Sequence, residues 1–275
     1  MILTKKETMA EIIRCGKDPS FFCKKYAKIS HPIRGLIPFD LYDFQSDALM
    51  EFKDHRFNVI LKARQLGIST TVAAYVCWLM LFHRDKNVLI VATKLATATN
   101  LVKKIKAIHR HLPPWLKIAE ISIDNRQSFE LSNASQVKAS STSGDAGRSE
   151  ALSLLVVDEA AFVEGMEELW AGLYPTLSTG GRCIALSTPN GVGNWFHKTY
   201  TEAQENKNDF HTIKLPWEVH PERDQEWFVK ETRNMSKRQI AQELECSFNA
   251  SGETVINPED LQRLHGLLSD PLYRT

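Results

Sequence analysis

The residues best suited to chemistry form a short loop that follows an apolar run. Val59, Ile60 and Leu61 predict a buried strand, and the apolar stretch 72–79 predicts a helix. Between them lies the segment Lys62-Ala63-Arg64-Gln65-Leu66-Gly67-Ile68-Ser69-Thr70. A strand, a tight loop containing glycine and a helix form the layout of a phosphate-binding loop, in which helix amides hold the phosphates of a nucleotide. We therefore expect Ser69 or Thr70 to offer a hydroxyl to Mg²⁺.

The loop departs from the usual phosphate-binding pattern at two positions. Aligned on Gly67 and Ser69, the position of the usual lysine holds Ile68, and the position of the first glycine holds Lys62. A lysine at the entrance of the loop can reach back over the phosphates, and Arg64 offers a second cation. Taken alone, the segment is also compatible with an ordinary strand, turn and helix.

An acidic pair follows a second apolar run. Leu154 to Val157 predict a buried strand, and Asp158 and Glu159 stand at its end. An aspartate there can hold Mg²⁺ directly or through water, and the next glutamate can polarise the water that attacks a terminal phosphate.

A third buried strand, expected over 182–186, leads into Ser187-Thr188-Pro189-Asn190-Gly191. In nucleic-acid motors a polar strand end of this kind senses the terminal phosphate and relays its loss. Without the other two segments, residues 189–191 would be a plain turn.

With these segments in order, the chain resembles the ATPase domain of the large terminase subunit, the DNA-packaging motor of tailed bacteriophages and related viruses. The likeness is carried by 62–70, 154–160 and 187–191, with Leu41-Tyr42-Asp43-Phe44-Gln45 ahead of them. It spans roughly residues 38–255, and a lysine shifted to the front of the loop is itself a habit of that family. The resemblance implies an α/β P-loop NTPase fold of the RecA-like (ASCE) type, with a mostly parallel sheet flanked by helices and a small helical lid subdomain.

The resemblance also implies roles for single residues. Gln45 would contact the adenine edge of ATP, Ser69 and Asp158 would hold Mg²⁺, and Glu159 would be the catalytic base. Arg64 would join Glu159 in catalysis. The ATP-binding loop would comprise Lys62, Ala63, Arg64, Gln65, Leu66, Gly67, Ile68, Ser69 and Thr70.

Two further roles concern contact between subunits and the coupling of hydrolysis to movement. Arg148 lies where terminases place an arginine that reaches the nucleotide of a neighbouring subunit; its alternative is a solvated arginine in a loop rich in Ser and Gly. Ser187, Thr188 and Pro189 would couple phosphate release to movement of the lid.

Four parts are expected along the chain. They are an N-terminal helical segment (1–38), the P-loop ATPase core (39–216), the lid subdomain (217–256) and the start of a linker (257–275). Large terminase subunits normally continue into a metal-dependent nuclease domain. The last residues hold no set of spaced carboxylates that could bind two metals, so we expect the motor part without the nuclease.

Other patterns predict the remaining elements. Apolar strands alternate with amphipathic helices, as in a mostly parallel sheet flanked by helices, and residues 121–140 indicate short antiparallel strands inserted in it. A helix over 40–52 would carry Gln45. The other expected elements are strands over 87–93 and 212–217, a helix over 96–108, and lid helices over 224–233 and 236–244.

The expected helix over 96–108 carries a basic run, Lys103-Lys104-Ile105-Lys106, which continues into His109-Arg110-His111. We assign this run to a solvated outer face, with a contact to DNA or to a partner as the alternative. Glu164, Glu167 and Glu168 are likewise assigned to surface charge.

Composition limits the function classes less than the motifs do. The chain has 34 basic and 33 acidic residues, so it lacks a global positive charge, but a motor that grips DNA transiently needs only a local patch. The five cysteines lack C-x-x-C spacing, so we expect reduced thiols and no cysteine zinc site. We expect no signal peptide, no membrane span and no membrane partner.

The leading hypothesis is a motor that couples Mg²⁺-dependent ATP hydrolysis to translocation of double-stranded DNA into a procapsid. Its expected partners are DNA, the portal protein and the small terminase subunit, with a homo-oligomeric ring on the procapsid and a monomer when isolated. The expected location is the host cytoplasm, docked on the procapsid and not in the mature virion. The alternatives are a helicase-like ATPase and a nucleotide-binding assembly module without turnover.

Overall fold

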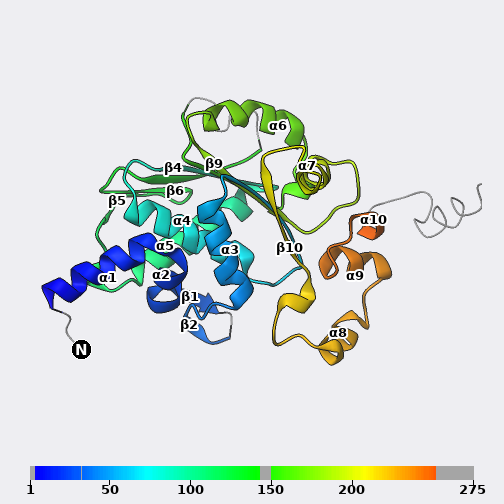
Figure 1. Ribbon diagram of the computed structural model, residues 1–275, viewed down its shortest axis with the longest axis horizontal. Helices are drawn as coiled ribbons and strands as arrows, with labels where there is room; N and C mark the ends of the chain where they lie inside the picture. Colours follow the sequence, from blue (N-terminus) through cyan, green and yellow to red (C-terminus); the bar gives the residue numbers. More distant parts are fainter. Residues whose placement is uncertain (1–3, 32, 143–149, 252–275) are drawn as a thin grey trace, which may run out of the picture.

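The structure is a computed structural model that describes residues 4–31, 33–142 and 150–251 (Figure 1). One sheet of eight strands forms its centre, in the order β10-β3-β9-β8-β4-β7-β6-β5. Neighbouring strands from β10 to β7 run parallel, whereas β6 and β5 are antiparallel to their neighbours. The strands are β3 (Phe57–Lys62), β4 (Asn87–Ala92), β5 (Ile121–Asp124), β6 (Ser128–Leu131), β7 (Gln136–Ser140), β8 (Leu154–Asp158), β9 (Arg182–Ser187) and β10 (Phe210–Leu215).

Helices cover both faces of this sheet, which confirms the α/β prediction (Figure 1). α6 (Met166–Leu173) and α7 (Trp195–Gln204) lie on one face. The other face carries α3 (Asp43–Asp54), α4 (Ile68–Phe82) and α5 (Leu95–Arg110), with α1 (Lys5–Lys17) and α2 (Pro19–Tyr26) outside them. None of the helices in the described part of the chain is long and apolar enough to cross a membrane.

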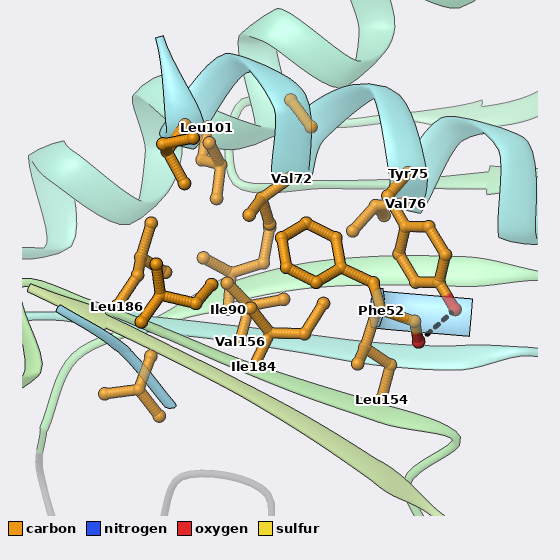
Figure 2. Packing of buried hydrophobic residues seen from close by; sticks show 14 of the residues in the cluster. Phe52, Val72, Tyr75, Val76, Ile90, Leu101, Leu154, Val156, Ile184 and Leu186 are labelled. Atoms are coloured by element: carbon orange, nitrogen blue, oxygen red, sulfur yellow. Dashed lines mark hydrogen bonds between the residues drawn. The ribbon is translucent and has the colours of Figure 1, made fainter. Parts of the chain in front are cut away.

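The central layer is apolar because it is covered on both sides. Every residue of β8 is buried, and β3 and β9 are buried except at one end, as expected of parallel strands between helices. Figure 2 shows Val72 and Val76 of α4 packed over Ile90, Val156 and Ile184 of the sheet. Each such side chain contributes about 1.5–3 kcal/mol when it leaves water. This packing fixes α4, and with it the loop that α4 follows.

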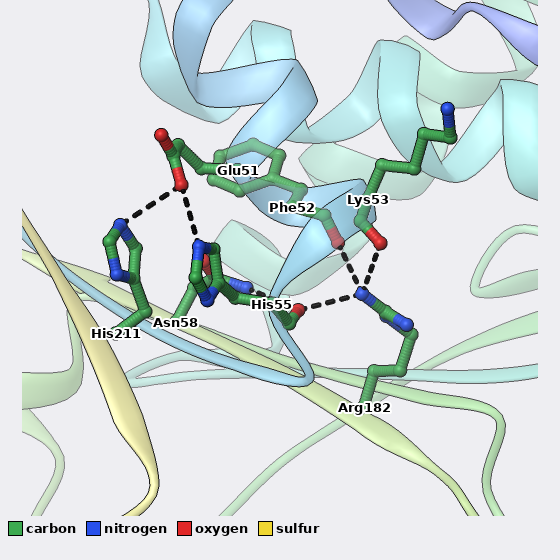
Figure 3. A network of polar contacts seen from close by, with 7 residues as sticks. All are labelled: Glu51, Phe52, Lys53, His55, Asn58, Arg182 and His211. Atoms are coloured by element: carbon green, nitrogen blue, oxygen red, sulfur yellow. Dashed lines mark hydrogen bonds and ion pairs between the residues drawn. The ribbon is translucent and has the colours of Figure 1, made fainter.

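The amino ends of the strands hold a polar network (Figure 3), which we call the amino-end network: Glu51, His55, Asn58, Arg182 and His211. A guanidinium nitrogen of Arg182 donates to the carbonyls of Phe52, Lys53 and His55 at 3.0, 2.6 and 2.7 Å. These carbonyls end α3, where cations satisfy unpaired acceptors and oppose the helix dipole. The two histidine rings stack at 3.8 Å, and each reaches the same Glu51 oxygen, at 3.1 Å from His55 and 3.0 Å from His211.

Beyond the edge strand β10 lie α8 (Gln225–Thr232), α9 (Lys237–Glu243) and α10 (Phe248–Ser251), within the predicted lid (Figure 1). Asp224 and Ser236 cap α8 and α9, and Ser236 forms a capping box with Gln239. The boundaries of the four predicted parts stay a prediction, and residues 252–275 lie outside the described part.

Some expected elements shift. The helix expected over 40–52 runs from Asp43 to Asp54, because Tyr42 is its extended N-cap. The strand expected over 212–217 begins earlier, and Pro216 ends it. Two antiparallel strands, β1 (Lys28–His31) and β2 (Gly35–Pro38), occupy the end of the stretch that was expected as an N-terminal helical segment (1–38).

Candidate active site

The predicted site residues meet at one edge of the sheet because the strands that carry them are parallel. Lys62 ends β3, Asp158 ends β8 and Ser187 ends β9. The strand register pairs Leu61 with Ser187, and it pairs Asp158 with Ala92 at the end of β4. In open parallel sheets, ligands bind at these carboxyl ends.

A left-handed turn joins β3 to α4. Gly67 has φ +73°, and a Cβ at this position would lie 2.6 Å from the side-chain nitrogen of Gln45, so glycine is required there. The Gly67 carbonyl accepts from the amides of Thr70 and Thr71 and so starts the helix. The turn therefore leads directly into the first residues of α4.

Gln45 supports this turn from α3. Its side-chain nitrogen donates to the Leu66 carbonyl at 2.9 Å, and its side-chain oxygen accepts from the Tyr42 amide at 3.2 Å. The residue is buried. It lines a cavity of about 900 Å³ together with Gly67 and Thr70 of the loop. Contact with adenine stays a prediction, and the observed contacts make Gln45 a support of the loop.

The entrance of the loop is bound to β10 and to the predicted lid. The amides of Ala63 and Arg64 donate to the carbonyls of Leu215 and Glu243, at 2.7 and 2.8 Å. The Arg64 guanidinium pairs with the Glu243 carboxylate at 2.5 Å, and Arg223 donates to the carbonyls of Arg64 and Gln65. The amides of Ala63 and Arg64 thus bond to other parts of the protein, and the Arg64 guanidinium pairs with a carboxylate of the predicted lid.

Asp158 and Ser69 form the candidate magnesium site. Asp158 is 7% exposed and accepts a hydrogen bond from the Ser69 side chain. Burial raises the pKa of Asp158, and the neighbouring charge of Glu159 adds to this, whereas Lys62 and the Ser69 bond oppose it. A carboxylate beside a hydroxyl is an all-oxygen donor set of the kind that Mg²⁺ takes together with substrate phosphates. These two residues therefore fit Mg²⁺.

Glu159 is held in a set position by its backbone and by a neighbour. It lies in the left-handed region (φ 56°, ψ 38°), and its carboxylate accepts from the Thr93 hydroxyl at 2.7 Å. Thr93 follows β4 directly and was not among the predicted site residues. The sequence feature that could have pointed to Thr93 is a small polar residue at the end of a predicted strand.

A cavity of about 480 Å³ opens beside Glu159. It is lined by Lys62, Arg64, Thr93, Lys94, Thr142, Glu159, Phe162, Glu164 and Thr188. Glu164 is exposed, as predicted for surface charge, and it also lines this cavity. The cavity brings together Lys62 and Arg64 of the loop, and Lys94 at the start of α5, with the acid that could activate water.

The predicted coupling segment contacts the turn after Glu159. The Ala161 amide donates to the Ser187 hydroxyl at 3.2 Å, and the Asn190 side chain donates to the Ala161 carbonyl at 3.2 Å. Thr188 lines the cavity, and Pro189 follows it. Arg148 lies outside the described residues, so its role stays a prediction.

The assignment of the basic run on α5 to a solvated face is partly wrong. Lys106 is buried and pairs with Asp124 at 2.6 Å, and His109 is buried against the Ala119 carbonyl. Lys104 reaches in the other direction, and its ammonium group donates to the Thr70 hydroxyl at 3.0 Å. Helical periodicity placed these residues away from the sheet, but neighbouring elements cover that side of α5.

Comparison with known proteins identifies the family. Residues 59–263 match the family model described as terminase large subunit, T4likevirus-type, N-terminal. The chain belongs to this terminase family. The recognition made from the sequence is confirmed.

Solved terminase structures share the fold. The large terminase ATPase domain of Thermus phage P74-26 matches with a TM-score of 0.58 and 20% identity, over 73% of this chain and 92% of that domain. The HK97 bacteriophage large terminase matches with a TM-score of 0.62 and 17% identity, over 92% of this chain and 52% of that protein. A large terminase from a thermophilic bacteriophage, solved with ADP, matches with a TM-score of 0.60 and 12% identity, over 74% and 52%. The chain thus spans about half the length of these two large terminase chains.

Proposed function

We propose that this terminase chain is the ATPase motor domain that couples Mg²⁺-dependent ATP hydrolysis to translocation of double-stranded DNA into a procapsid. The observation that carries the proposal is the meeting of Asp158, Ser69, Lys62 and Glu159 at one edge of the sheet, beside a cavity. The matched terminase of a thermophilic bacteriophage was also solved with ATP-γ-S, which supports nucleotide binding in this family.

ATP binding would use the carboxyl ends of the strands. Lys62 lies among the charges around Asp158 and would neutralise phosphate charge there. Arg64, which lines the same cavity, would leave Glu243 and turn toward the phosphates. Ser69 and Asp158 would hold Mg²⁺, which would supply positive charge to the phosphates.

Hydrolysis would be a displacement at the terminal phosphorus. Glu159 would accept a proton from water as the water oxygen attacks, while the bond from the terminal phosphorus to the bridging oxygen breaks. Thr93, which donates to the Glu159 carboxylate, would keep it aimed at that water. Thr188 lines the cavity, and the hydroxyl of its neighbour Ser187 accepts from the Ala161 amide. Loss of the phosphate beside Thr188 would therefore be transmitted to the turn that carries Glu159.

The assembly would be a ring of such subunits on a procapsid, bound to double-stranded DNA, the portal protein and the small terminase subunit, in the host cytoplasm. Arg148 would complete the nucleotide site of a neighbour within this ring. An arginine supplied in this way is worth roughly a thousandfold or more in hydrolysis rate. The rate per chain should therefore rise with protein concentration.

The test is phosphate release from ATP, with and without Mg²⁺, over a range of protein concentrations. Glu159→Gln should reduce turnover by about a hundredfold or more, because a positioned general base contributes that much. It should leave ATP binding intact. The control is Glu167→Gln, an exposed carboxylate of α6 that pairs with exposed Lys198 at 3.6 Å, and it should change nothing.

Two outcomes would change the proposal. Preserved turnover in Glu159→Gln would remove the base from this residue. ATP binding without Glu159-dependent turnover at any concentration would favour a nucleotide-dependent assembly module, a reading that the apolar Ile68 in the loop also supports.

A further inference from the structure

The first turn of α4 lacks a cation of its own. Ile68 occupies the position where phosphate-binding loops carry lysine, and its side chain is 1% exposed within the hydrophobic core. Ser69 and Thr70 complete this turn with neutral hydroxyls. A polyanion docked on the turn would need its counter-charge from another element.

The neighbouring helix supplies one. α5 packs along α4, and Lys104 extends from it to the start of α4, where its ammonium group lies 3.0 Å from the Thr70 hydroxyl. Thr70 follows Ser69, whose hydroxyl bonds to Asp158. Lys104 therefore reaches the same first turn that presents the candidate magnesium ligand.

The electrostatics of Lys104 agree with this position. Although the residue as a whole is exposed, desolvation of its ammonium group lowers the pKa of Lys104, and the charge of Lys62 lowers it further, while Asp158 opposes both. Two lysines thus share one small region with a single buried carboxylate. An arriving phosphate would relieve their repulsion.

We propose that Lys104 is a phosphate-binding residue that α5 delivers to the first turn of α4, in addition to Lys62 at the entrance of the loop. The inference rests on the proposed function, since its ligand is the triphosphate of ATP. A neutral hydroxyl now accepts from Lys104, and an anionic phosphate oxygen is a stronger acceptor. The ammonium group would exchange Thr70 for phosphate with little movement.

The other lysines of the run do not share this placement. Lys103 is exposed on the same helix. Lys106 is buried, donates to Asp124 and the Asn125 carbonyl, and lies over the Phe129 ring. Lys103 is therefore a matched control that alters the net charge equally.

The experiment is equilibrium titration of the intact chain with a fluorescent ATP analogue and Mg²⁺. Lys104→Met keeps the length of the apolar stem and removes the charge. It should bind the analogue about tenfold to a hundredfold more weakly, since a charge-assisted bond is lost. Lys103→Met should bind like the parent, and Lys104→Arg should recover part of the affinity.

Parent-like affinity in Lys104→Met would overturn the inference. So would an affinity loss in Lys104→Met that accompanies a fall in the thermal midpoint and disappears when binding is titrated well below that midpoint, because Lys104 would then act only in folding. If the parent chain itself binds no ATP, the proposed function fails first. A parent that binds ATP beside an unaffected Lys104→Met leaves the proposed function standing and removes only the role of Lys104.

Discussion

The two ends of the sheet use polar residues in opposite ways. In the amino-end network the partners are other parts of the protein: Arg182 bonds to the last carbonyls of α3, and both histidines reach Glu51 (Figure 3). At the carboxyl ends, Lys62, Glu159 and Thr188 line a cavity of about 480 Å³. Arg182 also lines a cavity, of about 760 Å³, but its bonds hold α3 in place, whereas the carboxyl-end groups surround a space that ATP could fill.

Burial strengthens this contrast. Asp158 is 7% exposed, and burial raises its pKa, so a charged carboxylate at the carboxyl end destabilises the fold. A bound cation would offset this desolvation penalty. Substitutions at the amino ends should therefore lower the stability, and substitutions at the carboxyl ends should weaken nucleotide binding.

The largest effect on stability should come from Arg182→Ala. It leaves three carbonyls at the end of α3 without their cationic donor, which should cost about 2–3 kcal/mol of unfolding free energy. Urea unfolding measures this, with exposed Arg84→Ala as the control that should stay close to the parent. An equal loss in both variants would mean that the amino-end network does not stabilise α3.

A smaller effect should appear with pH. Burial lowers the pKa of His211 below its usual 6.5, with repulsion from His55 adding to this and Glu51 opposing it. The folded state then binds fewer protons than the unfolded state, so stability should fall as pH drops through about 6.5. The urea midpoint should fall from pH 7.5 to 5.5, and it should fall less in His211→Asn. Equal falls in parent and variant would exclude His211 as a source of the pH dependence.

The sequence predicted those features that depend on local pattern. Unbroken apolar runs located β3, β8 and β9, and the polar residues that follow such runs must gather at one edge of a parallel sheet. The lid helix expected over 236–244 is α9, and Ser236 caps its start. The order of these segments along the chain carried the family resemblance.

Features that depend on packing between distant elements escaped prediction. Lys104 follows helical periodicity to the polar side of α5, and only the position of α4 turns it toward the loop. The pairing of Arg64 with Glu243 requires the lid to fold back on the loop. Thr93 gains its partner only because β4 and β8 are neighbours in the sheet.

The contrast between the two ends is tested most directly by measuring ATP-analogue affinity and thermal midpoint together in the parent, Lys62→Ala and Arg182→Ala. Binding is titrated well below the unfolding temperature of each. We predict that Lys62→Ala binds about tenfold or more weakly, because a charged hydrogen bond to phosphate is lost, and that its thermal midpoint falls less than that of Arg182→Ala. Arg182→Ala should unfold earlier and bind like the parent. Parent-like binding by Lys62→Ala, or loss of binding in a folded Arg182→Ala, would contradict the division of labour between the ends of the sheet.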